Sequence, residues 1–247
     1  MTDAPARRSY TVVGAGAVGL LYGTRLAEAG HPVRWLVRSG VEELRRHGVE
    51  VRTEGRTLRI RPDDVVVATE GGDLPPSDVV LLATKTTANH LLADLVGPAC
   101  APGTTVVVLQ NGLGAEERLR AEVPDAGPVL GGLCFVCAHR SAPGRAEHLD
   151  YGAVTLAPLE PRHLAAAEHV AGDLAGAGVE TTTLSDLAVA RWRKLVWNIP
   201  FNGLCTVLDA TTEELLADPS TRTLVAELMG EVAAGARAVG SALPDSV

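Results

Sequence analysis

The chain has 247 residues, and its 46% apolar, 21% charged and only 3% aromatic content is ordinary for a soluble protein with an aliphatic core. A net charge of −8 argues against nucleic acid as a partner, because no basic face can dominate an acidic chain. The sequence shows neither a signal peptide nor an apolar run long enough to span a bilayer, so we expect no membrane contact and a cytoplasmic location.

The first part of the chain alternates strand-like and helix-like segments. In chain order, we expect a strand at residues 10–16, a helix at 17–30, a strand at 32–38, a short helix at 40–48, a hairpin at 49–61, strands at 78–85 and 104–112, a strand-rich segment at 129–156, a helix at 167–178 and a short strand at 179–184. The runs 78–85 and 104–112 are uninterrupted and apolar, which is typical of parallel strands buried on both faces.

The pattern from residue 185 onward is helical only. Ser185-Asp186 reads as the cap of a helix that extends past Lys194, and further helices are expected at 211–218 and 220–240. Each of the last two begins near Ser or Thr with Glu close by, as capping chemistry requires.

These elements predict an α/β fold with two domains. An N-terminal Rossmann-type doubly wound sheet is expected at residues 1–184, followed by an all-helical domain at 185–247. The final residues, ALPDSV, read as the start of another helix, so we expect the second domain to be incomplete. A helical domain this thin needs a partner surface, which suggests a homodimer.

The run GAGAVG satisfies the pattern G-x-G-x-x-G between the first strand and the first helix. The first glycine permits a tight turn, the second lets the backbone approach a pyrophosphate, and the third lets the helix pack on the strand. The helix N-terminus then offers free N–H groups to the phosphates. A glycine turn that binds nothing is the alternative, but the complete strand–helix–strand context favours a dinucleotide. The expected cofactor-binding residues are Gly14, Ala15, Gly16, Ala17, Val18 and Gly19.

The end of the second strand discriminates between cofactors. An enzyme that uses NAD usually has Asp or Glu there, to bind the ribose 2′-hydroxyl. Here the position holds Arg38, and no acidic residue occurs before Glu42. An arginine can pair with a 2′-phosphate, so we favour NADP(H), although Arg38 could also be an ordinary solvated side chain.

The distribution of lysine is unusual. Of the 22 basic residues only Lys85 and Lys194 are lysines, and both occupy candidate site positions. Lys85 closes the strand-like run 78–85, and Asn111 closes 104–112, so both are expected at the carboxyl edge of the sheet where ligands bind.

Lys194 begins a polar stripe within an apolar helical run. Asn198 and Asn202 follow it at intervals of four, which places all three on one helix face, and Pro200 is expected to kink the helix between them. Such a stripe could bind a small oxygen-rich molecule. Equally, Lys194 could extend its head to solvent while the asparagines satisfy the kinked backbone.

The order G-A-G-A-V-G, T-K at a strand end, Q-N-G-L-G and W-R-K-L-x-x-N-x-x-x-N resembles the ketopantoate reductase family (2-dehydropantoate 2-reductases) over most of the chain. The resemblance implies NADPH-dependent reduction of a 2-oxo acid to a 2-hydroxy acid. It also implies that Lys194 is the catalytic proton donor, that Asn111 lies near nicotinamide and substrate, and that Asn198 and Asn202 bind substrate. Lys85 and Arg38 would contact the cofactor. The family's substrate-binding serine and acidic residue have no counterpart in this sequence.

Two other functions stay open at this point. The chain could be an NADP(H)-binding sensor or partner protein without catalysis, or a reductase of a different small keto acid whose pocket is shaped by the apolar run 131–138. His139 and His148 lie in strand-like segments and are not expected to be catalytic. The pair Cys134 and Cys137 also lies in such a segment, so we expect packing there and no metal site.

Overall fold

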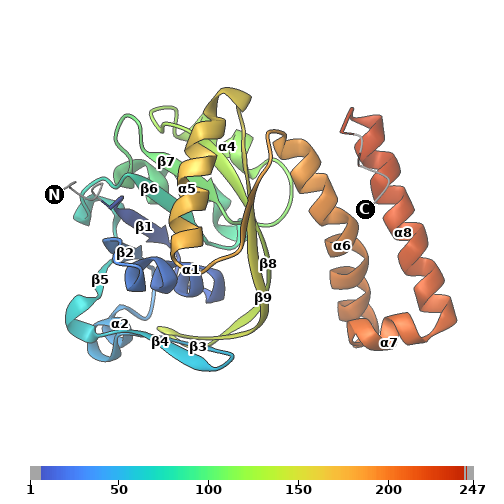
Figure 1. The fold of residues 1–247 in the computed structure, drawn as a ribbon, viewed down its shortest axis with the longest axis horizontal. Helices are drawn as coiled ribbons and strands as arrows, with labels where there is room; N and C mark the ends of the chain where they lie inside the picture. Colours follow the sequence, from blue (N-terminus) through green and yellow to red (C-terminus); the bar gives the residue numbers. More distant parts are fainter. Residues whose placement is uncertain (1–6, 242, 244–247) are drawn as a thin grey trace. The chain divides into compact units, whose positions relative to one another are not determined.

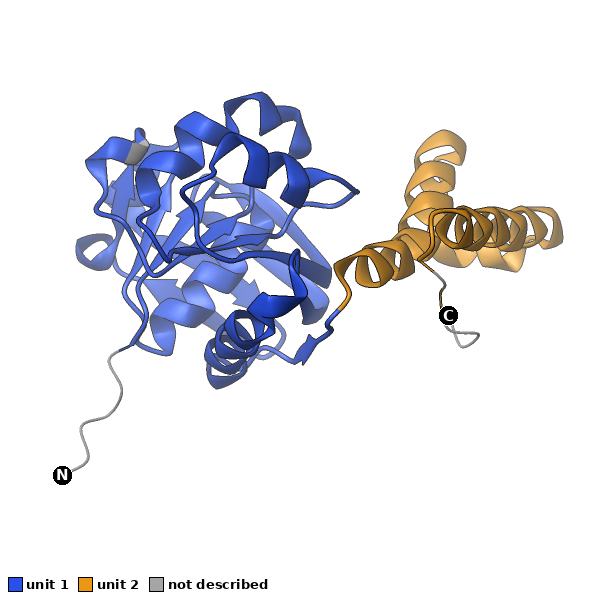
Figure 2. Ribbon diagram, turned by 90° about the horizontal axis from the view of Figure 1, so that it is seen from above, with its two compact units in different colours: residues 1–185 blue, residues 186–247 orange. Residues whose placement is uncertain are grey.

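A computed structural model describes residues 7–241 and residue 243. The chain divides into two compact units, residues 1–185 and residues 186–247 (Figure 2).

The first unit is built on one mixed sheet of ten strands among its described residues (Figure 1). Nine of them follow the order β4-β3-β9-β8-β7-β6-β1-β2-β5, and β10 pairs with β9. The strands are β1 (Tyr10–Val13), β2 (Val33–Leu36), β3 (Val49–Thr53), β4 (Arg56–Ile60), β5 (Val66–Ala68), β6 (Val79–Leu82), β7 (Thr105–Val108), β8 (Val129–Ala142), β9 (Arg145–Pro158) and β10 (Thr181–Thr183).

Helices connect these strands. The α-helices are α1 (Ala17–Glu28), α2 (Val41–His47), α3 (Leu92–Val96), α4 (Ala115–Glu122) and α5 (Leu164–Gly176). Short 3-10 helices are η1 (Pro62–Asp64), η2 (Gly71–Asp73), η3 (Thr86–Leu91), η4 (Gly97–Ala99) and η5 (Pro161–His163). The predicted α/β class with a helical C-terminal region is therefore confirmed.

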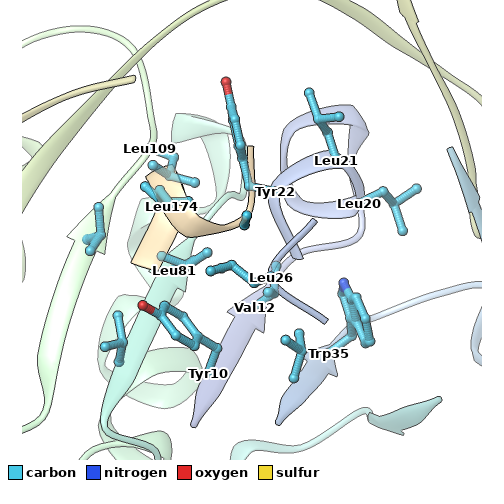
Figure 3. Packing of buried hydrophobic residues seen from close by; sticks show 14 of the residues in the cluster. Tyr10, Val12, Leu20, Leu21, Tyr22, Leu26, Trp35, Leu81, Leu109 and Leu174 are labelled. Atoms are coloured by element: carbon cyan, nitrogen blue, oxygen red, sulfur yellow. The ribbon is translucent and has the colours of Figure 1, made fainter. Parts of the chain in front are cut away.

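Strands β7, β6, β1, β2 and β5 are parallel to their neighbours. Every residue of β7, β6 and β1 is buried, whereas Val66 of the edge strand β5 is exposed. Alternate residues of these strands pack into two separate cores, because successive side chains of a strand point to opposite faces of the sheet. Val12 and Leu81 join the core beneath α1 and α5, where Leu26 packs beside them (Figure 3). Val13 and Leu82 join the core beneath α3 and α4. The burial on both faces predicted for the runs 78–85 and 104–112 is confirmed by β6 and β7.

The remaining strands extend the sheet with antiparallel pairs. The predicted hairpin at 49–61 is confirmed as β3 and β4, with Val51 opposite Leu58 and Gly55 at a positive φ of 79° in the tip. The strand-rich segment forms the long hairpin β8–β9, whose pairing shifts register at three places. Helices α3 and α4 and strand β5 are elements that the sequence analysis did not anticipate, since each is short and lacks a clear apolar period.

A partly buried carboxylate connects α5 to the start of β1. Asp173 accepts two hydrogen bonds from Arg8, at 2.6 and 2.8 Å, and one from the Tyr10 hydroxyl at 2.6 Å. Burial raises the pKa of Asp173, but the hydrogen bonds from Arg8 and Tyr10 and the charge of Arg8 outweigh it, so its pKa lies below the usual value. The ionised carboxylate is therefore the form that stabilises the fold.

Asp173→Asn is expected to lower the free energy of unfolding at neutral pH by about 1–3 kcal/mol, because charge-assisted hydrogen bonds are lost. Since the pKa is depressed in the folded state, the wild-type contribution is present above the unfolded pKa of about 4 and is lost as the pH falls through the folded pKa. Denaturant unfolding between neutral and acidic pH should therefore show a weaker pH dependence in the variant. Asp64→Asn, which removes only an exposed pairing with Arg61, is the control. An unchanged pH dependence in Asp173→Asn would contradict this role.

The second unit contains α6 (Leu187–Leu208), α7 (Thr212–Ala217) and α8 (Pro219–Ala238) within its described part. The predicted caps of the first two helices are confirmed: Asp186 accepts from the Val189 amide, and Thr211 forms a capping box with Glu214. The expected serine start of the last helix is wrong, because α8 begins at Pro219 and Asp218 caps it by accepting from the Ser220 and Thr221 amides. Phe201, Leu215 and Val225, one from each helix, form a small core. The helix expected to start within ALPDSV lies outside the described residues. None of the helices that the structure describes is both long and apolar enough to cross a membrane.

Candidate functional site

The glycine loop closes tightly over the end of β6. Gly14 has a φ of 104°, and its N–H donates to the Leu36 carbonyl at 2.8 Å. A Cβ on Gly14 would lie 3.1–3.2 Å from atoms of Thr84 and Ala83. A Cβ on Gly19 would lie 2.1 Å from the Gly14 carbonyl oxygen, which no side chain can tolerate. Both positions thus require glycine, as the dinucleotide pattern predicts.

The helix that follows this loop presents its N-terminus without a side-chain cap. Gly16 is the N-cap of α1, and the first intrahelical bond runs from the Leu20 N–H to the Gly16 carbonyl at 2.9 Å. The first turn of α1 contains no acidic residue. Its N–H groups and the positive end of the helix dipole are therefore available to an anion such as a pyrophosphate.

The parallel strands bring the other predicted cofactor residues to the same sheet edge as the loop. Val13 of β1 pairs with Leu36 of β2 on one side and with Leu82 of β6 on the other. Exposed Arg38 follows β2, while exposed Lys85 follows β6 and caps η3. Asn111, also exposed, follows β7.

The glycine loop consequently lies between an arginine on one side and a lysine and an asparagine on the other. This arrangement fits a dinucleotide: the loop leaves room for backbone approach, the helix N-terminus complements the phosphates, and Arg38 can pair with a further phosphate.

A buried polar cluster at this edge was missed by the sequence analysis. The Gln110 side chain donates to Thr84 Oγ1 at 3.1 Å and to Asn89 Oδ1 at 2.8 Å. The sequence signal was the polar pair Gln110-Asn111 after an apolar run, but only Asn111 was singled out.

In the second unit, α6 places three predicted residues on one face. It is continuous from Leu187 to Leu208, so Lys194, Asn198 and Asn202 keep their spacing of four residues. Lys194 and Asn198 are half-buried and Asn202 is exposed. Pro200 lies inside the helix and does not end it. The neighbouring Phe201 packs against Trp197, with ring centroids 4.2 Å apart and the rings tilted by 35°.

The histidines and cysteines that the sequence analysis set aside lie on the β8–β9 hairpin. His139 is 3.7 Å from Glu147, and His148 is hydrogen-bonded to the Tyr151 carbonyl at 2.9 Å. Cys134 is buried but Cys137 is exposed, so the expectation of packing is wrong for Cys137, whose side chain the strand directs to the surface. Within the described residues there is no cluster of His, Cys, Asp and Glu suited to a metal.

Family models describe both units of the chain. The model of ketopantoate reductase PanE/ApbA matches residues 10–161, and the model of its C-terminal region matches residues 186–247. The chain belongs to the ketopantoate reductase family. The resemblance found in the sequence is thereby confirmed, and the chain is placed in a family of oxidoreductases.

Individual relatives agree with this family. The chain is 41% identical to the 2-dehydropantoate 2-reductase of Nostoc sp. over 97% of this chain and 76% of that protein. A crystal structure of 2-dehydropantoate 2-reductase from Geobacter metallireducens is 38% identical, with a TM-score of 0.87 over 92% of this chain and 75% of that chain. D-mandelate dehydrogenase with NADH and anilino(oxo)acetate is 25% identical, with a TM-score of 0.85 over 95% of this chain and 75% of that chain.

Proposed function

We propose that the chain reduces a 2-oxo acid to a 2-hydroxy acid with NADPH, and that the substrate is ketopantoate. The observation that carries the proposal is Lys194 on the polar face of α6, four residues before Asn198, in a chain whose only other lysine follows β6 at the carboxyl edge of the sheet. Membership in the ketopantoate reductase family supports the same reaction.

The first unit would hold the cofactor. Backbone N–H groups of the loop from Gly14 to Gly19 and of the first turn of α1 would bind the pyrophosphate. Arg38 would pair with the 2′-phosphate, and Lys85 and Asn111 would contact the cofactor from the other side of the loop. When bound, the nicotinamide supplies the hydride for the reduction.

The second unit would supply the proton. Hydride delivery to a carbonyl carbon places a negative charge on the carbonyl oxygen. The Lys194 ammonium would donate a hydrogen bond to that oxygen, stabilise the developing charge and then transfer its proton to the alkoxide. Asn198 and Asn202, on the same helix face, would hold the hydroxyl groups of the substrate.

Arg38→Ala is expected to weaken NADPH binding by about tenfold and to leave NADH binding nearly unchanged, because only NADPH carries the phosphate that Arg38 would bind. Fluorescence titration with both cofactors measures the two dissociation constants. Arg46→Ala, which removes another exposed arginine from the nearby helix α2, is the matched control. Equal losses for both cofactors, or no loss for either, would argue against a 2′-phosphate contact.

Steady-state oxidation of NADPH with ketopantoate tests the function itself. The structural likeness to D-mandelate dehydrogenase, whose structure contains NADH and anilino(oxo)acetate, favours one specific alternative, an aromatic 2-oxo acid as substrate. Phenylglyoxylate, with NADPH and with NADH, should therefore be compared with ketopantoate. A higher kcat/KM for ketopantoate with NADPH supports the proposal. A higher kcat/KM for phenylglyoxylate would show that the substrate is an aromatic 2-oxo acid instead. NADPH binding without turnover of any 2-oxo acid would instead point to the non-catalytic alternative.

A further inference from the structure

A buried amide links the ends of two parallel strands at the predicted cofactor edge. Gln110 follows β7 and is only 4% exposed. Its Nε2 donates to Oγ1 of Thr84, which follows β6, and to Oδ1 of Asn89 in η3. Asn89 is itself 9% exposed, so the hydrogen bond between Gln110 and Asn89 is screened from water.

The two acceptors lie on either side of Lys85. Thr84 immediately precedes Lys85, and Asn89 lies four residues after it in the 3-10 helix that Lys85 caps. The Gln110 amide therefore spans both ends of the turn that carries Lys85. Gln110 also directly precedes Asn111, so one side chain couples the backbone positions of both exposed residues.

The same cluster supports the glycine loop. Thr84 Cγ2 lies 3.1 Å from the point that a Cβ on Gly14 would occupy, so the loop rests directly on Thr84. A shift of Thr84 would be transmitted to the loop, because close-packed atoms transmit displacement.

We propose that Gln110 is a positioning residue that holds Lys85 and Asn111 at the geometry required for cofactor binding. This inference rests on the proposed function, because it takes NADPH as the ligand of this edge. Lys85 and Asn111 are exposed and follow strand ends, so burial of their own side chains does not hold them in place. The two hydrogen bonds from Gln110 supply that constraint, and their loss would leave the half-buried Thr84 hydroxyl and the buried Asn89 carbonyl without this donor.

The test is a double-mutant cycle on NADPH affinity. Dissociation constants would be measured by fluorescence titration for the wild type, Gln110→Leu, Lys85→Ala and the double variant, with thermal unfolding recorded for each. Thr104→Val is the matched control. Thr104 lies at the other end of the β7 segment, is also buried, and its hydroxyl donates to the Ser77 carbonyl at 2.7 Å and accepts from the Ala101 amide at 2.9 Å. The Thr104→Val variant removes hydrogen bonds of a buried side chain in the same strand region and leaves the cofactor edge unaltered.

We expect Gln110→Leu and Lys85→Ala each to raise the dissociation constant of NADPH by about tenfold. The double variant should lose clearly less affinity than the product of the two single losses, because the part of the Gln110 effect that acts through Lys85 is already absent. Thr104→Val should lower the unfolding temperature and leave affinity unchanged. Multiplicative losses in the double variant, or wild-type affinity in Gln110→Leu, would overturn the inference.

Two further outcomes are distinguishable from these. If the wild type does not bind NADPH, or Lys85→Ala binds it as the wild type does, the proposed function of this edge is wrong and the inference falls with it. If Gln110→Leu does not fold, Thr84→Val tests the inference in its place, because it removes the hydroxyl that accepts from Gln110 and keeps the shape of the side chain. Weaker NADPH affinity that is not additive with Lys85→Ala then supports the inference, and unchanged affinity overturns it.

Discussion

Lys194→Ala is expected to lower kcat for 2-oxo acid reduction by about 10²- to 10⁴-fold, the contribution typical of a positioned general acid. The dissociation constant of NADPH should change little, because the proposed cofactor contacts are in the first unit. The physical reason is that alanine provides neither a charge to stabilise the alkoxide nor a proton to neutralise it. Stopped-flow measurement of NADPH oxidation, with a separate cofactor titration, distinguishes the two effects.

Two variants sharpen this result. Lys194→Arg keeps the positive charge but gives up its proton far less readily, so it should remain strongly impaired if proton transfer is the role of Lys194. Arg193→Ala removes the exposed neighbouring cation and should retain nearly full activity. If Lys194→Ala kept a kcat close to that of the wild type, the assignment of Lys194 as proton donor would be wrong.

Gly19→Ala is expected to weaken NADPH binding by about 10²-fold, comparable to the loss that a displacement of about 1 Å causes at a catalytic site. The added Cβ would lie 2.1 Å from the Gly14 carbonyl oxygen, so the loop must move away from α1. That movement separates the loop backbone from the helix N-terminus, and the two would no longer bind the same pyrophosphate together.

The control for this variant is Gly172→Ala. Gly172 is exposed in α5, and a Cβ there would meet no atom within 4 Å. Because alanine favours a helix over glycine by about 1 kcal/mol, this variant should be slightly more stable and bind NADPH normally. NADPH affinity in Gly19→Ala equal to that of the control would show that the glycine loop does not bind the cofactor.

The parallel core of the sheet could be predicted from sequence because its signal is local. The runs that became β6 and β7 are uninterrupted and apolar, as strands buried on both faces must be. Their ends were less predictable: the run expected to continue to Lys85 leaves the sheet after Leu82, where the glycine loop packs against Ala83 and Thr84.

Other features depend on contacts that no local pattern contains. The β8–β9 hairpin shifts register at three places, and such irregularities follow from the packing of the whole sheet. The role of Gln110 depends on Asn89, which lies 21 residues earlier in a 3-10 helix that the sequence did not predict. By contrast, the stripe of Lys194, Asn198 and Asn202 needed only helical periodicity and could be read directly.

The most direct test of the proposed reaction follows the hydride. The protein would be incubated with ketopantoate and NADPH that carries deuterium at both positions of the reactive nicotinamide carbon, and the product analysed by mass spectrometry. We predict pantoate that carries one deuterium at its 2-carbon, because the hydride passes from the cofactor to the carbonyl carbon. Absence of pantoate, or pantoate without the label, would contradict NADPH-dependent ketopantoate reduction by this chain.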